Sequence, residues 1–151
     1  MALDHTITHR LHTLSKLTDR VSQRAYESDA GIPFSEGRCL AAIGAFSPLS
    51  VNDLAQRANL NKGQASRAAQ SLVDQGLVRK ASSVTDGRGV VLTLTAKGER
   101  VWRRLMGVIE RRNAEIVACL DAAEVAQFSR LLDRLVDHAR STADNGTDPL
   151  D

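Results

Sequence analysis

The stretch Leu60-Asn-Lys-Gly-Gln-Ala-Ser-Arg-Ala-Ala-Gln-Ser-Leu-Val-Asp-Gln-Gly-Leu-Val78 decides the fold of this chain. It predicts a short helix, because Asn61 can cap the first turn and Gln64, three residues later, can complete a capping box. Gly76 can adopt the left-handed conformation that ends a helix, and Leu77-Val78 can then start a strand. The role of this helix has to be inferred from the residues on its two sides and from the segments that flank it.

The predicted helix has an apolar side and a polar side, since residues three and four positions apart share a face. The residues expected to pack are Ala65, Ala68, Ala69, Leu72 and Val73. The residues on the opposite side are Gly63, Gln64, Arg67, Gln70, Ser71 and Asp74. A polar side of this kind can be an ordinary solvated helix face, or it can bind a ligand.

The polar side has the chemistry that reads DNA. Arg67 can bond bidentately to guanine, whereas Gln64 and Gln70 can pair with adenine. Gly63 would let the backbone approach the duplex closely. The residues expected to position phosphates are Lys62, Ser66 and Ser71.

The segments on either side complete a helix-turn-helix and a wing. Upstream, Ser50-Val-Asn-Asp53 is a helix start, and a helix of about eight residues with a turn through Asn59-Leu60 leads into the reading helix. Downstream, Leu77–Val84 and Gly89–Leu94 favour β-structure, and the Asp-Gly pair between them indicates a hairpin. At the predicted tip, Arg88 suits a narrow minor groove, and Asp86 can orient its guanidinium.

These motifs resemble the MarR (multiple antibiotic resistance regulator) family of transcription factors. The wing signature is matched by Asp86-Gly-Arg88 followed by Leu94-Thr-Ala-Lys-Gly98, and the recognition helix by Asn61–Arg67 with Leu72 and Gly76-Leu-Val78. Gly31-Ile-Pro with Arg38-Cys-Leu40 is similar to the entry of the family's second helix. The resemblance implies a homodimeric, sequence-specific DNA-binding regulator, expected to be a repressor of a gene near its own.

The distribution of charge agrees with a DNA partner. The net charge is only +2, but residues 54–112 hold 12 Lys and Arg against 4 Asp and Glu, whereas residues 113–151 hold 3 against 8. The basic residues therefore cluster on and beside the predicted reader, as an electrostatic footprint for nucleic acid requires.

Apolar residues at three- and four-residue steps predict the remaining helices. One is expected over residues 4–30 and another over Phe34–Phe46. After the wing, Thr95 can cap a long helix that runs to about Cys119, and Asp121-Ala-Ala-Glu124 is a capping box that opens a last helix.

The expected fold is mainly α with a small β-wing, in a single domain over residues 1–151. The winged helix-turn-helix lobe takes residues 34–98, the dimerisation helices take 1–33 and 99–143, and 144–151 form a flexible tail. The terminal helices hold more apolar surface than a small winged-helix core can cover. We expect a two-fold homodimer, which would place two reading helices about one DNA turn apart on a pseudo-palindromic operator. A monomer that folds these helices onto itself is the alternative.

The family resemblance also implies a small-molecule effector, such as an aromatic carboxylate or its thioester. It would bind between the dimer helices and the DNA-binding lobe, where cationic groups from the first two helices hold the carboxylate. The candidates in this chain are Arg10, His12, Lys16 and Arg38. Each can instead be a member of a surface salt bridge.

Two other sensing modes are open. His5, His9 and His12 are spaced to share a helical face and could bind a metal, although a solvated or dimer-contact face is the simpler interpretation. Cys39 is expected to be a small core residue, but Arg38 beside it could lower its pKa and make it redox-active.

Other functional classes have little support in the sequence. Cys39 and Cys119 are far apart and do not indicate a disulfide scaffold or a thiolate zinc site. The sequence shows no membrane span, leader, catalytic triad or phosphate loop, so we expect a cytoplasmic protein without enzymatic activity, cofactor or metal. The alternative from another class is a winged helix that binds only proteins.

Overall fold

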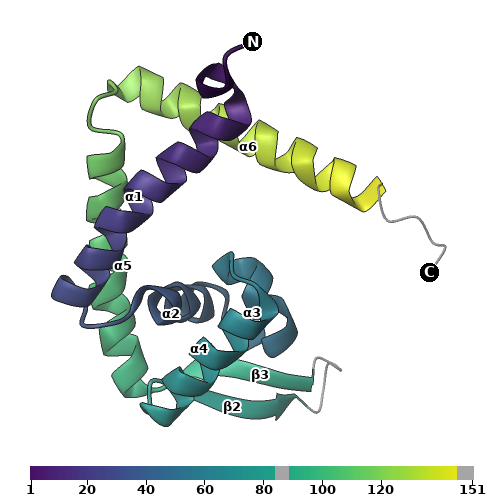
Figure 1. The fold of residues 1–151 in the computed structure, drawn as a ribbon. Coiled ribbons are helices and arrows are strands. Elements are labelled where there is room, and N and C mark those ends of the chain that lie inside the picture. The colour runs from purple at the N-terminus through teal and green to yellow at the C-terminus, as the bar shows by residue number, and fades with distance from the viewer. Residues whose placement is uncertain (84–88, 146–151) are drawn as a thin grey trace. The chain divides into compact units, whose positions relative to one another are not determined.

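The computed structural model describes residues 1–83 and 89–145. The chain divides into two compact units, Met1–Arg112 and Asn113–Asp151. The first unit holds a short 3₁₀ turn, the helices α1 to α4, most of α5 and three strands (Figure 1). The bounds of these elements are 3₁₀ Leu3–His5, α1 Ile7–Asp29, α2 Phe34–Phe46, β1 Leu49–Ser50, α3 Val51–Ala58, α4 Lys62–Asp74, β2 Val78–Ser83, β3 Gly89–Leu94 and α5 Ala96–Ile116, whose last four residues belong to the second unit. The second unit holds α6, Ala122–Asn145.

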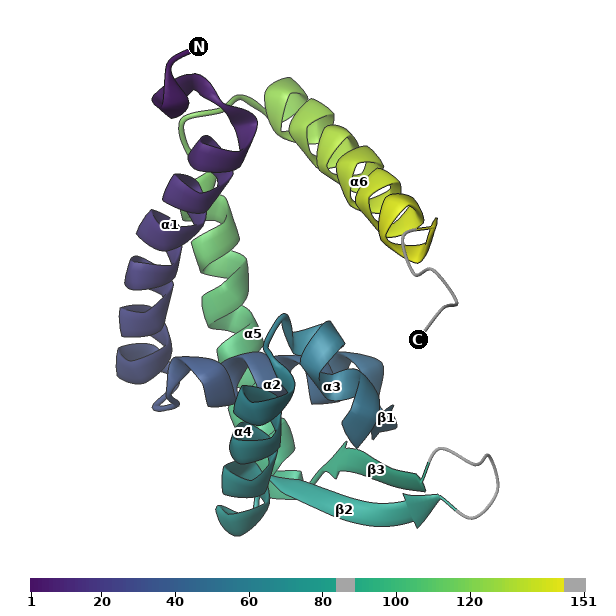
Figure 2. The same cartoon turned by 45° about the vertical axis from the view of Figure 1, so that its right-hand side comes forward.

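The three strands form one antiparallel sheet in the order β1-β3-β2. The register of β2 with β3 runs from Val78 opposite Leu94 to Ser83 opposite Gly89, and Leu49 of β1 lies opposite Leu92. Figure 2 shows β1 at the far side of β3 from β2, next to α3. The mainly α fold with a small β-sheet is therefore confirmed.

The start of α1 differs from the helix expected over residues 4–30. Thr6 caps α1, because its hydroxyl oxygen accepts a hydrogen bond from the His9 amide at 3.3 Å, and residues 3–5 form a separate 3₁₀ turn. His5 therefore lies outside α1, and only His9 and His12 share that helix. Near the other end of the chain, α5 ends at Ile116, three residues before the expected Cys119.

Local capping explains the helix-turn-helix. The Ser50 hydroxyl accepts from the Asp53 amide at 3.1 Å at the start of α3, and Asn59 ends that helix with a φ of 54°. At α4, the Asn61 side chain accepts from the Gln64 amide at 2.8 Å, and the Gln64 side chain accepts from the Asn61 amide at 3.3 Å. The capping box predicted for the recognition helix is therefore present.

The connection between helix and sheet depends on two glycines. Gly76 has a φ of 74°, a left-handed conformation that favours glycine. Its carbonyl accepts a 2.6 Å hydrogen bond from Thr95, whose hydroxyl also accepts from the Gly98 amide at 3.0 Å to cap α5. A Cβ on Gly98 would lie 1.8 Å from the Leu77 carbonyl oxygen, so only glycine allows α5 to approach the chain this closely.

The core of the first unit is almost entirely aliphatic. Its largest completely buried side chains are Leu40, Ile43, Leu54, Leu72, Leu92 and Leu105. Trp102 packs at the edge of this core and donates a 3.3 Å hydrogen bond to the Ala41 carbonyl. The core therefore joins α2, α3, α4, β3 and α5 and fixes the position of α4 against the sheet.

Both α1 and α6 carry apolar side chains that the chain itself leaves exposed. Those on α1 are Ile7, Leu11, Leu14, Leu17 and Val21. Those on α6 are Phe128, Leu131, Leu135 and Val136. Over residues 1–83 and 89–145, each helix is either too short or too polar to span a lipid bilayer.

Candidate nucleic-acid interface

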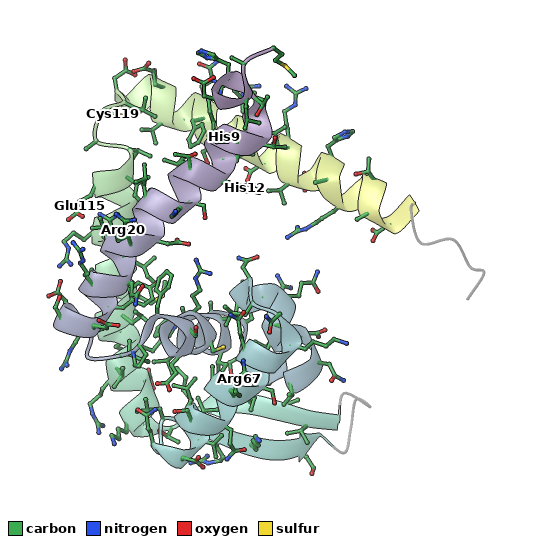
Figure 3. The ribbon with its side chains drawn as sticks, in the orientation of Figure 1. His9, His12, Arg20, Arg67, Glu115 and Cys119 are labelled. Carbon is green, nitrogen blue, oxygen red and sulfur yellow. The ribbon has the colours of Figure 1, made fainter. Side chains whose placement is uncertain are left out.

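The helix α4 packs on one side and is open on the other. Ala65, Ala68, Ala69 and Leu72 are buried, as the sequence predicts. The exposed residues are Lys62, Gly63, Gln64, Ser66, Arg67, Gln70 and Asp74. Figure 3 labels Arg67 on this helix, in the lobe that also contains β2 and β3. The structure therefore places most of the predicted DNA-reading residues on one accessible face.

The first two turns of α4 carry Gly63, Gln64 and Arg67. The side-chain oxygen of Gln64 accepts a hydrogen bond in the capping box. The side-chain NH₂ group of Gln64 is therefore left to donate outward. A Cβ at Gly63 would lie 3.3 Å from Nη1 of Arg67. A larger residue at position 63 would therefore press on the guanidinium.

The Gln70 amide is held by two charged neighbours. Its oxygen accepts a 2.9 Å hydrogen bond from Nζ of Lys80, on β2, and its nitrogen donates a 2.8 Å hydrogen bond to Asp74. Sequence reasoning placed Asp74 on the polar side but gave it no role, and it did not identify Lys80. The bond from Lys80 links the recognition helix directly to a strand of the wing.

Ser71 lies differently from the other predicted contacts. It is half-buried, and its hydroxyl donates a 2.6 Å hydrogen bond to Oε1 of Glu36, on α2. Gln75 donates to Oε2 of the same carboxylate at 3.1 Å and to the Ser71 hydroxyl at 3.0 Å. Ser71 thus holds α4 against α2, and its predicted contact with DNA stays a prediction. No local sequence signal could have found Glu36, because its partners follow it by more than thirty residues.

The two residues predicted for the wing tip, Asp86 and Arg88, lie outside the described residues. The strand that leads to the tip is described, and it carries exposed Arg79 and Lys80. Basic side chains therefore continue from α4 onto β2.

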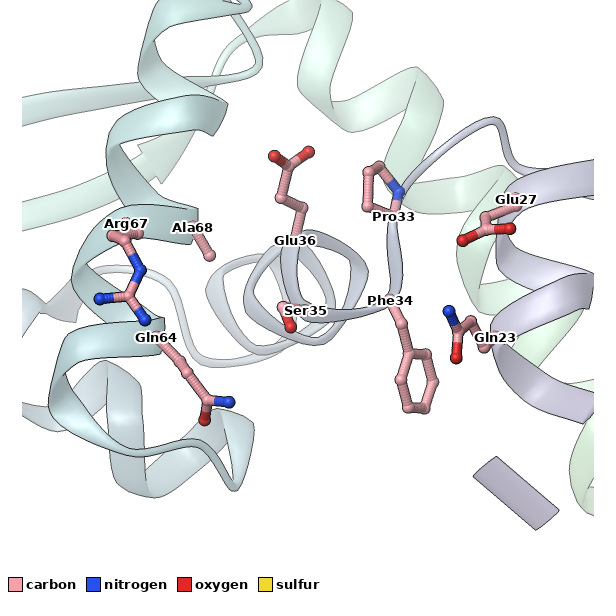
Figure 4. Close-up of a pocket in the computed structure, with 9 residues that line it drawn as sticks. All are labelled: Gln23, Glu27, Pro33, Phe34, Ser35, Glu36, Gln64, Arg67 and Ala68. Carbon is pink, nitrogen blue, oxygen red and sulfur yellow. The ribbon is translucent and has the colours of Figure 1, made fainter. Parts of the chain in front are cut away.

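A cleft of about 530 Å³ opens between α1, α2 and α4. Figure 4 shows Gln64 and Arg67 on its α4 side, Gln23 and Glu27 on its α1 side, and the start of α2 between them. The full lining is Gln23, Glu27, Pro33, Phe34, Ser35, Glu36, Gln64, Arg67 and Ala68. Two predicted base readers therefore also border a cavity.

An adjoining cleft of about 490 Å³ is more basic. It shares four residues with the first: Gln23, Phe34, Ser35 and Gln64. Its other lining residues are Lys16, Asp19, Arg20, Arg38, Asn59 and Leu60. The Arg38 guanidinium lies 4.4 Å from the centre of the Phe34 ring and donates a 3.2 Å hydrogen bond to Asp19.

The structure brings together only two of the four effector candidates. Lys16 and Arg38 line the second cleft, whereas Arg10 lines a separate apolar depression with Leu14 and Leu17, and His12 borders none of these cavities. Sequence reasoning missed Arg20, which lines the second cleft beside Lys16. Their four-residue spacing on α1 could have identified the pair.

The proposed redox chemistry of Cys39 does not fit its surroundings. Cys39 is completely buried, and burial raises the pKa of its thiol to about 11, with a smaller contribution from the charge of Glu36. The expectation that Cys39 is a small core residue is therefore confirmed, and the alternative in which Arg38 lowers its pKa is wrong. Among the described residues, no group of three or more His, Cys, Asp or Glu side chains could hold a metal ion.

Comparisons with known proteins point to one family of transcriptional regulators. The sequence model that represents the MarR family matches residues 30–89. The HTH-type transcriptional repressor Rv2887 of Mycobacterium tuberculosis is 31% identical over 108 residues, which are 72% of this chain and 78% of that protein.

Solved structures agree with this result. The structure of Rv2887 with salicylic acid has a TM-score of 0.73 at 27% identity and covers 89% of this chain and 99% of that one. The PcaV regulator of Streptomyces coelicolor, in complex with its natural ligand, has a TM-score of 0.70 at 26% identity, with 92% and 97% covered.

Proposed function

Because this chain belongs to the MarR family of transcriptional regulators, we propose that it is a homodimeric repressor that binds a pseudo-palindromic DNA operator and is released by a small-molecule effector. One observation carries the proposal. The recognition helix α4 is fixed by its capping box and buried alanines so that its other face, with Arg67 and Gln70, is exposed.

DNA binding is proposed to combine base reading with phosphate contacts. Arg67, Gln64 and Gln70 would read base edges in the major groove, and Gly63 would allow close approach. The positioning contacts would come from Lys62, Ser66 and Ser71. Arg88, oriented by Asp86, would enter the adjacent minor groove.

Dimerisation is supported by the apolar side chains on the terminal helices. Leu17 is 55% exposed on α1, and Leu135 is 55% exposed on α6. Exposed apolar side chains repeated along two helices of one chain are expected to be covered in solution. A second copy would cover them and would also supply the second reading helix that a pseudo-palindromic site requires.

The effector is proposed to be a small aromatic carboxylate or its thioester. Salicylic acid and p-aminosalicylic acid are bound in the Rv2887 structures. In this chain the second cleft offers Lys16, Arg20 and Arg38 for a carboxylate, and the Phe34 ring for an aromatic group.

Release would be a shift between two forms of the dimer. The first cleft borders Gln64 and Arg67 and the second borders Gln64, so a ligand in either cleft lies next to the helix that would read DNA. One form has its reading helices wrongly spaced for the operator. A ligand can lower operator affinity only by as much as its own affinity for that form exceeds its affinity for the other form.

The test is selection of DNA from a random duplex pool by the full chain, followed by titration of the selected duplex at several salt concentrations. We expect two half-sites about one helical turn apart and an affinity that falls steeply with salt. Salicylate or a related aromatic acid should then weaken binding and raise the melting temperature. A winged helix that binds only proteins would select no DNA sequence, and that result would refute the proposal.

A further inference from the structure

The amide of Gln70 is fixed between a cation and an anion. Nζ of Lys80 donates to Oε1 at 2.9 Å, and Nε2 donates to Asp74 Oδ1 at 2.8 Å. Asp74 lies one turn further along α4, whereas Lys80 comes from β2, beyond the turn at Gly76. All three residues are exposed, so this short chain of hydrogen bonds lies on the open surface of the lobe.

The hydrogen-bonding chemistry of Lys80 and Asp74 determines the orientation of the Gln70 side-chain amide. An ammonium group can only donate and a carboxylate can only accept, so the amide oxygen must face Lys80 and the amide nitrogen must face Asp74. Turning the amide by half a rotation would place its N–H groups against the ammonium and its oxygen against the carboxylate. Both hydrogen bonds to charged groups would be lost, and these are stronger than neutral ones.

The two bonds leave half of the amide's capacity available. A glutamine side chain has two acceptor lone pairs and two N–H donors. Lys80 uses one lone pair and Asp74 uses one N–H. One acceptor and one donor remain, which is the combination that a bidentate contact with the N6 and N7 atoms of adenine requires.

We propose that Lys80 and Asp74 are positioning residues that set the base preference of Gln70, an inference that rests on the proposed binding of DNA. With the amide fixed, its remaining donor and acceptor have defined places, and adenine is favoured. With either neighbour removed, the amide can turn its NH₂ group toward the two acceptors of guanine. The wing strand thus contributes to sequence recognition through α4, without touching a base.

A simpler role for Lys80 predicts a different result. A lysine that only contacts a phosphate contributes equally to every sequence, and its removal weakens all sites alike. Arg79, also exposed, precedes Lys80 on β2 and provides the matched control, because Arg79→Met removes the same charge without removing a bond to Gln70. Lys80→Met and Arg79→Met therefore separate orientation from charge.

The experiment measures the affinity of the full chain for its selected duplex and for every single base-pair variant of that duplex. The wild-type chain and the variants Gln70→Ala, Lys80→Met, Asp74→Ala and Arg79→Met are compared, each after a thermal melt that verifies folding. We expect one position where the wild-type chain prefers adenine over guanine by roughly tenfold or more, and where Gln70→Ala removes the preference. Lys80→Met and Asp74→Ala should reduce it to within about threefold, and Arg79→Met should keep it.

The double variant Gln70→Ala/Lys80→Met gives a second measurement. If Lys80 acts through Gln70, adding Lys80→Met to Gln70→Ala changes no base preference and lowers all affinities together. The inference is overturned if Lys80→Met weakens all duplexes equally and keeps the adenine preference, or if Gln70→Ala changes no preference. A wild-type chain that selects no sequence refutes the proposed function itself, and the inference falls with it.

Discussion

The Glu36 carboxylate accepts a 2.6 Å hydrogen bond from the Ser71 hydroxyl, which ties α2 to the recognition helix. Its other oxygen accepts from Gln75 at 3.1 Å, so the last turn of α4 is held at two points. Glu36 also lines the cleft between α1, α2 and α4. A side chain that borders this cavity is therefore also one that holds the proposed DNA-reading helix in place.

Glu36→Ala is expected to destabilise the fold. The change removes both bonds and leaves the half-buried Ser71 hydroxyl without its charged acceptor. Hydrogen bonds to charged groups contribute about 1.5–3 kcal/mol, so the free energy of unfolding in urea should fall by about that amount. Glu27→Ala, at a carboxylate of the same cleft, should change it by less than about 0.5 kcal/mol. Equal losses in the two variants would contradict this role of Glu36.

Arg67→Ala is expected to weaken operator binding and to relax its specificity. The guanidinium is exposed on α4 and is placed to contact a guanine edge, so its loss should cost about 1–3 kcal/mol of binding free energy at one base pair. Titration of the selected duplex and its base-pair variants measures both effects. Arg104→Ala, at an exposed arginine of α5, is the control and should change neither affinity nor preference beyond a small charge effect. An unaltered base preference in Arg67→Ala would exclude α4 as the reading helix.

The sequence predicted those parts of the fold that depend on neighbouring residues. Ser50, Asn61 with Gln64, and Gly76 act within a few residues of the helix ends they define, and the structure confirms all of them. The expected start of the first helix at residue 4 was wrong for a local reason as well, because Thr6 forms the cap of α1 and leaves His5 outside it.

The parts that the sequence did not predict depend on contacts between distant segments. Glu36 meets Ser71, and Lys80 meets Gln70, only after α4 has packed and the chain has turned into β2. Cys39 is buried as expected, but the direction of its pKa shift also depends on the assembled core, because burial outweighs the neighbouring Arg38. Candidate site residues could thus be found by type, but not their partners.

Arg88→Ala is expected to weaken DNA binding and to reduce its dependence on salt. If Arg88 lies in the minor groove, its removal loses about one ionic contact with the duplex. A plot of log affinity against log salt should therefore become shallower by about one unit. The measurement is a salt titration with the selected duplex, and Arg130→Ala on α6 is the charge-matched control. A slope identical to that of the wild-type chain would remove the wing tip from the DNA interface.

Leu17→Glu is expected to separate the dimer. Leu17 is 55% exposed in the single chain, so a charge there should leave the fold of one copy intact but would be buried in the proposed interface. Light scattering after gel filtration should give the mass of one chain, and affinity for the two-half-site duplex should fall.

Ser15→Glu, at an exposed polar position of the same helix, adds the same charge and is expected to remain dimeric. Leu17→Glu would disagree with the proposed interface if it kept twice the chain mass at low micromolar concentration. A monomeric wild-type chain would refute dimerisation altogether.

The two cysteines are expected to react very differently with thiol reagents. Cys39 is buried and Cys119 is exposed. A raised pKa keeps a thiol protonated up to higher pH. With a pKa of about 11, only about one Cys39 side chain in a thousand is a thiolate at pH 8. The folded chain should therefore consume one equivalent of a disulfide reagent rapidly, and the chain in concentrated urea should consume two. Cys119→Ser should lose the fast reaction, whereas Cys39→Ser should keep it.

Because the thiolate is the species that peroxide oxidises, DNA binding should also survive treatment with peroxide in the absence of a reducing agent. Rapid labelling of folded Cys119→Ser, or loss of DNA binding on oxidation that Cys39→Ser prevents, would restore Cys39 as a redox sensor.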